Sequence, residues 1–592
     1  MSTEAAVKKP MLIDVSINGR VVTVEKGATI LEAAKKAQIK IPTLCKHEDL
    51  VTTASCGMCI VKVKGMRKMV RACAAPAEGG MEVVTHDAEL YEIRKNVLEL
   101  ILSRHPNDCL TCLRSGTCEL QALSQEFGIR TRNFEAMVLE QPIDVSTKAV
   151  VLDPTKCVGC GRCAEVCQNI QNVWALEFLD RGFEMRIAPA GDILLADSPC
   201  VKCGQCAAHC PVGAITDFDE TNKVWDALRN PELFAVAQIA PAVRVAFGEG
   251  FGLSPGEVTT KKIYALLRRL GFKAVFDTNF GADLTIVEEG TELLETLVKH
   301  PGKLPLVTSC CPAWIDYLEK YYPDLIEHFS TAKSPHQMVG VLAKTYYAEK
   351  SGIDPAKIFM ASIMPCTAKK WEISRTDEMF SSGYQDIDVS LTTRELVRMA
   401  LSSGIQFADL TDEEPDMIMG EYTGAGTIFG ATGGVMEAAV RTAYCLAEGK
   451  PLENIELNEV RGLKGVKTAV VNIKGKDVRI AVAHGLANVK ALLDPIREAK
   501  KKETDMPYDF IEVMACEGGC VAGGGQPYMV SDEMRRRRAE GLYKDDRASA
   551  KRMSHENPMV QALYKDFLGR PLGEKAHKLL HTKYKARPIY YK

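Results

Sequence analysis

The stretch 308-TSCCPAW-314 places two cysteines, Cys310 and Cys311, side by side and follows them at once with a proline. Two adjacent thiols cannot easily bind one metal ion together, because their side chains leave the backbone in different directions. The chain holds 21 cysteines, and all but one fall into five groups, four of which lie before residue 211. The role of the second thiol therefore depends on the chemistry of the other groups.

The overall composition is that of an ordinary globular protein with room for about three or four domains. Of 592 residues, 46% are hydrophobic and 26% are charged, and the formal net charge is -3, which argues against nucleic acid as the main partner. No apolar run reaches the length of a membrane helix, about 18 residues, and the start, MSTEAAVKKPMLIDV, has no signal-peptide core. We therefore expect a cytoplasmic protein without a membrane partner, whose cysteines serve metal or redox chemistry.

The first cysteine group follows a segment that predicts a small sheet. The runs MLIDVSI and RVVTVEKG indicate a hairpin with Asn18 and Gly19 at its turn, and TILEAAKKAQI indicates a helix. The cysteines that follow have the spacing C-x10-C-x2-C-x13-C and are Cys45, Cys56, Cys59 and Cys73. Four thiolates suit a [2Fe-2S] cluster, which needs two ligands per iron, and structural zinc is the alternative.

The second group replaces one cysteine with histidine. Its spacing is H-x3-C-x2-C-x5-C, and its members are His105, Cys109, Cys112 and Cys118. Taken alone, one imidazole and three thiolates suit zinc as well as a [4Fe-4S] cluster. Its place between redox modules favours the cluster, because another electron relay serves such a protein better than structural zinc.

The third and fourth groups form an internal repeat, 157-CVGCGRCAEVC-167 and 200-CVKCGQCAAHCP-211. Both copies have the spacing C-x2-C-x2-C-x3-C of a two-cluster bacterial ferredoxin, in which the fourth cysteine binds the other cluster. This rule predicts one cubane on Cys157, Cys160, Cys163 and Cys210, and a second on Cys200, Cys203, Cys206 and Cys167. Together with the first two groups, we expect four clusters in a row that form an electron wire.

Beyond residue 230 the pattern changes to alternating strands and helices. Apolar runs at 234–240, 357–363 and 479–485 alternate with helical segments such as 261-KKIYALLRRLG-271, which predicts βαβ units around a parallel or mixed sheet. Three motifs interrupt this region, and each is expected in a loop at a strand end. They are 308-TSCCPAW-314, 364-MPCTAKKWE-372 and 512-EVMACEGGCVAGGGQP-527. Four of their five cysteines would complete one more cubane site.

These three motifs, in this order, resemble the three signature loops of [FeFe]-hydrogenases, and the resemblance covers nearly the whole chain. The first group is similar to the [2Fe-2S] domain of respiratory complex I, and the second to the His-ligated [4Fe-4S] site beside it. The resemblance implies an H-cluster, a cubane joined to a two-iron unit with CO, cyanide and an amine-containing dithiolate. By motif, Cys311, Cys366, Cys516 and Cys520 hold the cubane, with Cys520 as the bridge. Lys369 then meets a cyanide, and Pro241, Ser334 and Met514 form walls.

The resemblance also assigns the second thiol. Cys311 is the ligand, and Cys310 stays a free thiol that passes protons to the amine, since splitting H2 requires a base beside the open iron. The family's proton route matches Glu289, Glu292 and Ser330, and Thr296 stands at its far end, where arginine is usual. Without the resemblance, the glutamates would be interpreted as a solvated helix face.

The predicted architecture is a multidomain α/β protein. We expect a β-grasp [2Fe-2S] domain at 1–85, a His/Cys3 [4Fe-4S] domain at 86–140 and a two-[4Fe-4S] bacterial ferredoxin domain at 141–225. The large α/β H-cluster domain follows at 226–592, with a segment from about 540 to 592 that resembles the separate small subunit of two-chain relatives.

Three other features have plainer interpretations. The run 535-RRRR-538 is expected on a solvated helix face, and Cys445 in the core. The glycine-rich 424-GAGTIFGATGG-434 lacks a clean nucleotide-binding pattern, so it is expected to allow close backbone packing near the H-cluster.

The sequence therefore predicts reversible oxidation of H2, with electrons relayed through one [2Fe-2S] and three accessory [4Fe-4S] clusters. No flavin or nicotinamide loop is found, so an NAD(P)-linked and possibly electron-bifurcating enzyme would need a flavin-binding iron-sulfur subunit as partner. This version is preferred. A stand-alone enzyme that uses ferredoxin is the first alternative. A non-catalytic iron-sulfur assembly or sensor protein is the second, and it would not need a proton relay.

Overall fold

The computed structural model describes residues 11–131, 133–135, 137–528 and 530–591. The N-terminal hairpin forms as predicted: strands β1 (Leu12–Ile17) and β2 (Arg20–Glu25) pair antiparallel, with Asn18 and Gly19 at φ of 50° and 82°. Positive φ at both central residues gives the turn the twist that a two-residue hairpin needs. The complete sheet has the order β2-β1-β5-β3-β4, with helix α1 (Ile30–Lys36), β3 (Ile60–Val63), β4 (Val70–Arg71) and β5 (Glu82–Val84).

The sequence repeat is also a structural repeat. Helices α4 (Arg162–Glu165) and α5 (Gln205–His209) each start after a glycine in the left-handed conformation, Gly161 or Gly204. Strands β6 (Val150–Leu152) and β9 (Ile215–Asp217) pair antiparallel, as do β7 (Glu177–Leu179) and β8 (Arg186–Ala188). Helices α2 (Ala88–Ser103) and α3 (Glu119–Glu126) precede this unit in the chain.

The large domain has two four-stranded sheets, where the sequence predicted a parallel or mixed sheet without giving a number. The first is fully parallel in the order β11-β10-β13-β14, with β10 (Phe234–Ile239), β11 (Ala274–Asp277), β13 (Ile358–Met364) and β14 (Val389–Thr392). The second has the order β12-β17-β16-β15, in which only β15 is antiparallel, with β12 (Leu306–Val307), β15 (Val466–Ile473), β16 (Lys476–His484) and β17 (Phe510–Met514).

Helix α8 (Thr278–Lys299) connects the cores beside these sheets. Phe280 and Leu284 pack with residues of β10 and β11, whereas Ala282 and Ile286 pack with residues of β16 and β17. The predicted helix at 261–271 is α7 (Thr260–Leu270). The other helices of this domain are α6 (Thr221–Arg229), α9 (Pro312–Tyr321), α10 (Pro335–Leu342), α11 (Ala348–Ser351), α12 (Lys369–Glu372), α13 (Thr393–Ser402), α14 (Gly424–Ile428), α15 (Gly434–Glu448) and α16 (Leu486–Lys502).

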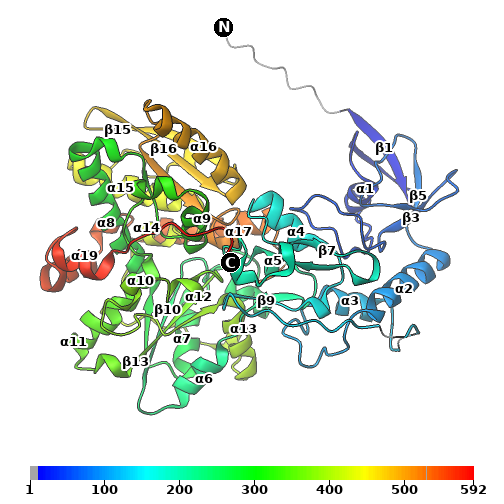
Figure 1. Ribbon diagram of the computed structural model, residues 1–592, viewed down its shortest axis with the longest axis horizontal. Coiled ribbons are helices and arrows are strands. Elements are labelled where there is room, and N and C mark those ends of the chain that lie inside the picture. The colour runs from blue at the N-terminus through cyan, green and yellow to red at the C-terminus, as the bar shows by residue number, and fades with distance from the viewer. Residues whose placement is uncertain (1–10, 132, 136, 529, 592) are drawn as a thin grey trace, which may run out of the picture.

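The C-terminal segment returns across the large domain, as Figure 1 shows in orange and red. It contains α17 (Asp532–Ala548), α18 (Pro558–Leu563) and α19 (Glu574–Leu580). Its backbone joins the loop before α10, because Lys333 N–H donates to Leu580 and Thr582 N–H donates to Thr331. No helix in the described part of the chain is long and apolar enough to span a membrane.

Figure 1 also shows the order of the domains in space. The β1–β5 sheet lies at one end of the molecule, the α4–α5 unit is central, and the large domain forms the other end. The glycine-rich segment packs closely as predicted: a Cβ on Gly426 would lie 2.6 Å from the Asn279 carbonyl oxygen.

Two sequence expectations are wrong. In 535-RRRR-538 only the middle pair is solvated: the side chains of Arg535 and Arg538 are 3% and 0% exposed and pair with Asp49 and Glu249. Residues three apart lie on one face of a helix, so this spacing turns both inward. Cys445 is only half-buried and not a core residue, because it lies near the outer end of α15.

Candidate metal clusters and active site

One cavity lies where the two sheets of the large domain meet. Loops at the carboxyl ends of β10, β12, β13 and β17 form it, which is where ligands bind in α/β proteins. All five cysteines of the three motifs line this cavity: Cys310, Cys311, Cys366, Cys516 and Cys520. The expectation that each motif follows a strand is met in all three cases.

The chemistry of these thiols fits a metal cluster. Burial raises the pKa of Cys311, and burial together with the charge of Cys311 raises the pKa of Cys366 to about 12. Several thiolates in one apolar space would therefore be unfavourable without a cation to neutralise them. Iron bound by four of these thiolates would supply the positive charge, and the fifth thiol would be left over.

Lys369 provides a fixed positive charge at the cavity. Its Nζ lies 2.7 Å from Glu372 Oε2 and 3.1 Å from the Cys310 carbonyl oxygen. Burial alone would lower the pKa of Lys369, but Glu372 raises it, so the ammonium stays charged. An ammonium with one remaining N–H in a dry cavity suits an anionic ligand.

The expected wall residues are only partly placed at the cavity. Pro241 and Met514 line it. Ser334 is not among the lining residues; it precedes Pro335, which is, and its buried hydroxyl has no hydrogen-bond partner among the described residues. Phe429 and Gly430 of the glycine-rich segment also line the cavity, in line with the expected packing of that segment, whereas the sequence reasoning missed Thr278, Ala282 and His336. They come from segments outside the cysteine motifs, so spacing gave no signal for them.

Glu289 is a fully buried carboxyl group, and not part of a solvated helix face. Its Oε1 accepts from the Ser309 hydroxyl at 3.4 Å, and its Oε2 has no hydrogen-bond partner among the described residues. Burial and the charge of Glu292 raise the pKa of Glu289 to about 8. Ser309 precedes Cys310, so this carboxyl lies close to the free thiol, and it can gain or lose a proton near neutral pH.

Ser330 continues this polar path towards the outside. Its hydroxyl donates to Glu292 Oε2 at 2.7 Å, and Glu292 is half-buried. The C-terminal segment covers this point, because the Tyr584 hydroxyl donates to the Ser330 carbonyl oxygen at 2.9 Å. Thr296, at the position where arginine is usual, is 7% exposed and adds no charge.

The two ferredoxin-type sites have the crossed composition that the repeat predicts. One small cavity is lined by Cys157, Cys160, Cys163 and Cys210. Another is lined by Cys200, Cys203, Cys206 and Cys167. The fourth cysteine of each copy therefore lies with the first three of the other, and both spaces are apolar and suited to cubanes.

The structure also brings together thiols of the first cysteine group and orients the histidine of the second. Cys59 and Cys73 have sulfur atoms 3.3 Å apart, and Cys45 contacts Cys56 and Cys73. His105 Nδ1 lies 2.8 Å from the Pro106 carbonyl oxygen, from which we assign Nδ1 as the donor and Nε2 as the nitrogen able to bind metal.

Two cysteine segments contact the same predicted cubane site, a branch that the expected row of four clusters did not include. The [2Fe-2S] loop contacts the first cubane site directly: Thr53 Oγ1 donates to the Cys160 carbonyl oxygen at 3.1 Å. The His/Cys3 segment reaches the same site, since Arg114 donates to the Cys210 carbonyl oxygen at 2.7 Å. Sequence order could not reveal this, because both segments fold back onto one unit.

The second cubane site adjoins the large cavity. A Cβ on Gly524 would lie 2.1 Å from the Cys203 carbonyl oxygen, so only glycine allows this approach. The Thr367 hydroxyl donates to the Lys202 carbonyl oxygen at 2.7 Å, and Thr367 follows Cys366. The [2Fe-2S] segment and the His/Cys3 segment therefore both contact the first cubane site, and the second cubane site lies next to the cavity.

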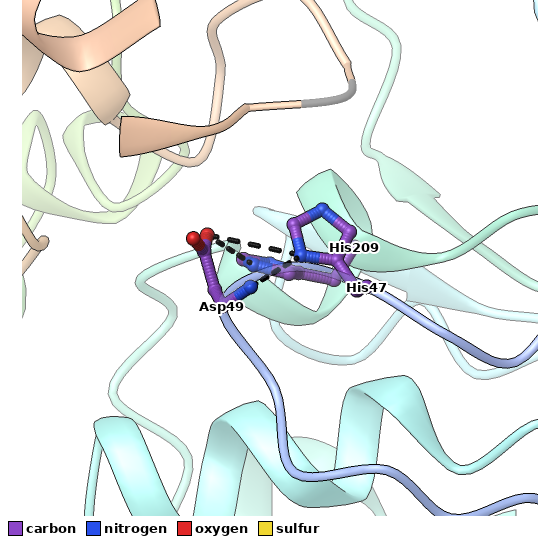
Figure 2. Close-up of side chains that lie close together, drawn as sticks. All are labelled: His47, Asp49 and His209. Atoms are coloured by element: carbon purple, nitrogen blue, oxygen red, sulfur yellow. Dashed lines mark hydrogen bonds and ion pairs between the residues drawn. The ribbon is translucent and has the colours of Figure 1, made fainter. Parts of the chain in front are cut away.

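A separate polar cluster joins the domains. Figure 2 shows the carboxylate of Asp49 facing the imidazoles of His47 and His209, with His209 Nε2 at 3.4 Å from Asp49 Oδ2. These groups are close enough for a metal ion. However, Arg535 donates to both carboxylate oxygens, at 2.9 and 2.5 Å, and already neutralises them. We therefore assign this cluster as an ionic contact between the [2Fe-2S] domain and α17.

The chain matches known protein families along almost its whole length. Residues 234–524 match the family described as iron only hydrogenase large subunit, C-terminal domain, and residues 532–587 match iron hydrogenase small subunit. Residues 11–88 match a 2Fe-2S iron-sulfur cluster binding domain, and residues 94–133 the NADH-ubiquinone oxidoreductase-G iron-sulfur binding region. Residues 150–169 and 197–216 each match a 4Fe-4S binding domain.

Several known proteins are similar to this chain. NADP-reducing hydrogenase subunit HndD of Solidesulfovibrio fructosivorans is 45% identical over 97% of this chain and 99% of that protein. Iron hydrogenase 1 of Clostridium pasteurianum is 40% identical over 96% of this chain and 99% of that protein. Cytosolic iron-sulfur assembly component 3 of mouse is 31% identical over 62% of this chain and 78% of that protein. Among solved structures, an apo variant of [FeFe]-hydrogenase HydA1 from Chlamydomonas reinhardtii has a TM-score of 0.56 at 43% identity, covering 62% of this chain and all of that chain.

Proposed function

Since the chain belongs to the [FeFe]-hydrogenase family and is an oxidoreductase that acts on H2, we propose that it is the catalytic subunit of an NAD(P)-linked hydrogenase complex. In this proposal one [2Fe-2S] and three accessory [4Fe-4S] clusters carry electrons between an H-cluster and a flavin-binding partner. The observation that carries the proposal is the cavity with five thiols beside a buried ammonium.

The residues of the cavity have distinct roles in this proposal. Cys311, Cys366, Cys516 and Cys520, which line the cavity, would hold the cubane, and Cys520 would also bind the diiron unit. When bound, the H-cluster supplies the iron at which H2 is split and the amine that accepts a proton. Lys369 binds an anionic ligand and orients it, and Pro241 and Met514 help to exclude water. Ser334 contributes a buried hydroxyl near the wall.

The chain itself moves the proton. The Cys310 thiol would donate to and accept from a base in the cavity, and burial keeps the thiol protonated at rest because it raises the pKa of Cys310 well above the ordinary value. Glu289 takes the proton next, Ser330 passes it on, and Glu292 releases it near the surface. A carboxyl whose pKa is about 8 suits this role, since it exchanges protons readily at neutral pH.

The choice of partner rests on two features. HndD, named as an NADP-reducing hydrogenase subunit, is similar over the full chain. The segment at 94–133 matches a region of NADH-ubiquinone oxidoreductase, an enzyme of nicotinamide oxidation. Both favour a flavin subunit at the [2Fe-2S] and His/Cys3 inputs. Ferredoxin is the alternative electron partner. None of the cysteines in the described part of the chain forms a disulfide, which favours a reducing compartment such as the cytoplasm.

An assembly role is a weaker candidate, supported by the 31% identity with cytosolic iron-sulfur assembly component 3. That likeness covers 62% of the chain. A scaffold for clusters has no use for a free Cys310 next to a buried Glu289, so these residues favour catalysis.

Hydrogen uptake by the anaerobically matured chain tests the proposal. The chain would be assayed alone and with co-purifying proteins, against viologen, ferredoxin and NAD(P)+. The proposal predicts that the isolated chain reduces viologen and that NAD(P)+ is reduced only when a flavin protein is present. Reduction of ferredoxin by the chain alone, with no co-purifying partner, would support the stand-alone enzyme instead.

A further inference from the structure

The ammonium of Lys369 is held by a chain of side chains that extends away from the cavity. Glu372, one turn along α12, places its Oε2 2.7 Å from Lys369 Nζ. The same oxygen lies 2.7 Å from Nε2 of His336, on α10. The His336 side chain is fully buried and Glu372 is 9% exposed at the side chain, so water competes little for these contacts.

The contacts of His336 fix the direction of its hydrogen bonds. A carboxylate can only accept, so Nε2 must carry the hydrogen that it shares with Glu372. Nδ1 then holds the lone pair of the neutral ring and lies 3.3 Å from Ser362 Oγ, which donates its own hydrogen to Ser390. Ser362 in β13 also lies 3.0 Å from the Ser390 hydroxyl in β14, its partner across the sheet. The parallel sheet is thereby connected to Lys369 through His336 and Glu372.

We propose that His336 and Glu372 are positioning residues, which hold the Lys369 ammonium towards the anionic ligand of the diiron unit. This inference rests on the role proposed for Lys369. Lysine has a long flexible stem and a compact charge, so it orients a ligand only when other contacts fix it. Besides Glu372, Lys369 donates to the Cys310 carbonyl oxygen, and these two contacts leave one N–H for the cavity.

The arrangement also sets the charge at this side of the cavity. Glu372 neutralises Lys369, so the pair adds no net charge there, while the ammonium still faces the ligand. Removing either outer residue leaves the ligand-binding lysine in place but frees its head group. Loss of such outer contacts at metal sites costs about 10- to 100-fold in activity.

Three variants test the inference: His336→Leu, Glu372→Gln and His336→Gln. Each would be produced with its cubane and then loaded with a synthetic diiron unit, and infrared spectra of the cyanide and CO bands would be recorded before any assay. We expect H336L and E372Q to shift the cyanide bands and to lower H2 evolution by about 10- to 100-fold. H336Q should stay within about threefold of the wild-type protein, because its amide can still donate to Glu372.

His328→Leu is the matched control. His328 is also a buried histidine, 3% exposed, but it bonds the Lys303 carbonyl oxygen and does not line the cavity. Unmoved cyanide bands in both H336L and E372Q would overturn the positioning role, even if activity had fallen. A wild-type protein that takes up no diiron unit would instead contradict the proposed function itself.

Discussion

At the scale of single residues, the most informative group is Glu289. A carboxyl group with no charge partner in a closed interior normally destabilises a fold, so its burial points to a functional reason. The proposed route from Cys310 needs a group that can hold and release a proton, and the neighbouring Ser309 and Ser330 hydroxyls cannot do so alone.

Replacing Glu289 by glutamine should block this route. The variant keeps the size of the side chain but cannot exchange a proton, so we expect H2 turnover to fall by at least about 100-fold. The iron content and the cluster spectra should not change. Glu295→Gln on the same helix, a partly exposed residue paired with Lys299, is the matched control and should keep full activity. Equal activities for the two variants would exclude Glu289 from the route.

The raised pKa of Glu289 also predicts how stability depends on pH. The folded protein binds this proton up to a pH of about 8, whereas the unfolded chain loses it near 4.5. The stabilising effect of the bound proton is complete below pH 4.5 and is lost as the pH rises through 8. Thermal unfolding should therefore show E289Q gaining stability relative to the wild-type protein between pH 5 and about 8.5. A constant difference over this range would mean that the carboxyl is ionised in the fold.

At the scale of elements, we expect close backbone contacts to determine electron transfer between the cluster sites. Gly524 lies in the loop after β17 and touches the Cys203 carbonyl oxygen of the second cubane site. Any side chain at this position must push the two loops apart, and backbone atoms cannot rotate out of the way.

Gly524→Ala should therefore separate catalysis from electron transfer. We expect a destabilisation of about 1–3 kcal/mol from overpacking, and slower H2-dependent reduction of viologen. Exchange between D2 and protons, which needs no accessory cluster, should change much less. Gly302→Ala is the control, because a Cβ there meets nothing within 4 Å. If both reactions of G524A fell equally, the contact would affect the cavity and not the relay.

The sequence predicted many of the helices and strands correctly. The predictions failed for contacts between residues that lie far apart in the chain. The grouping of the cysteines was predictable because C-x2-C spacing constrains two thiols locally. The strands before the three motifs were predictable because they are apolar runs. The role of His336 was not, since its partners Glu372 and Ser362 come from two other elements, α12 and β13. Arg535 and Arg538 were misjudged because composition indicated solvent, whereas the helix phase turned them inward.

At the scale of the whole molecule, the main feature is that two cysteine segments contact the same predicted cubane site. Two surface modules reach one cubane site, which suits an enzyme that exchanges electrons with more than one carrier. The [2Fe-2S] module is also fixed to the large domain by the pair of Asp49 and Arg535, far apart in sequence.

Arg535→Gln should loosen that module. Removing one partner of a buried ion pair costs about 3–5 kcal/mol, and Asp49 would be left without its main counter-charge. We expect faster proteolytic release of the [2Fe-2S] domain and slower electron entry through it. Arg536→Gln, at a side chain that is 62% exposed, is the matched control. Equal proteolysis of both variants would show that the ionic contact does not hold the module.

The most direct test of the account compares wild-type protein with Cys310→Ser. Both would be produced with all iron-sulfur clusters, loaded with a synthetic diiron unit, and assayed for H2-dependent viologen reduction. The account predicts that both take up the diiron unit, that the wild-type protein becomes active, and that C310S loses at least about 100-fold of that activity because the relay is broken. A fully active C310S, or a loaded wild-type protein without activity, would contradict it.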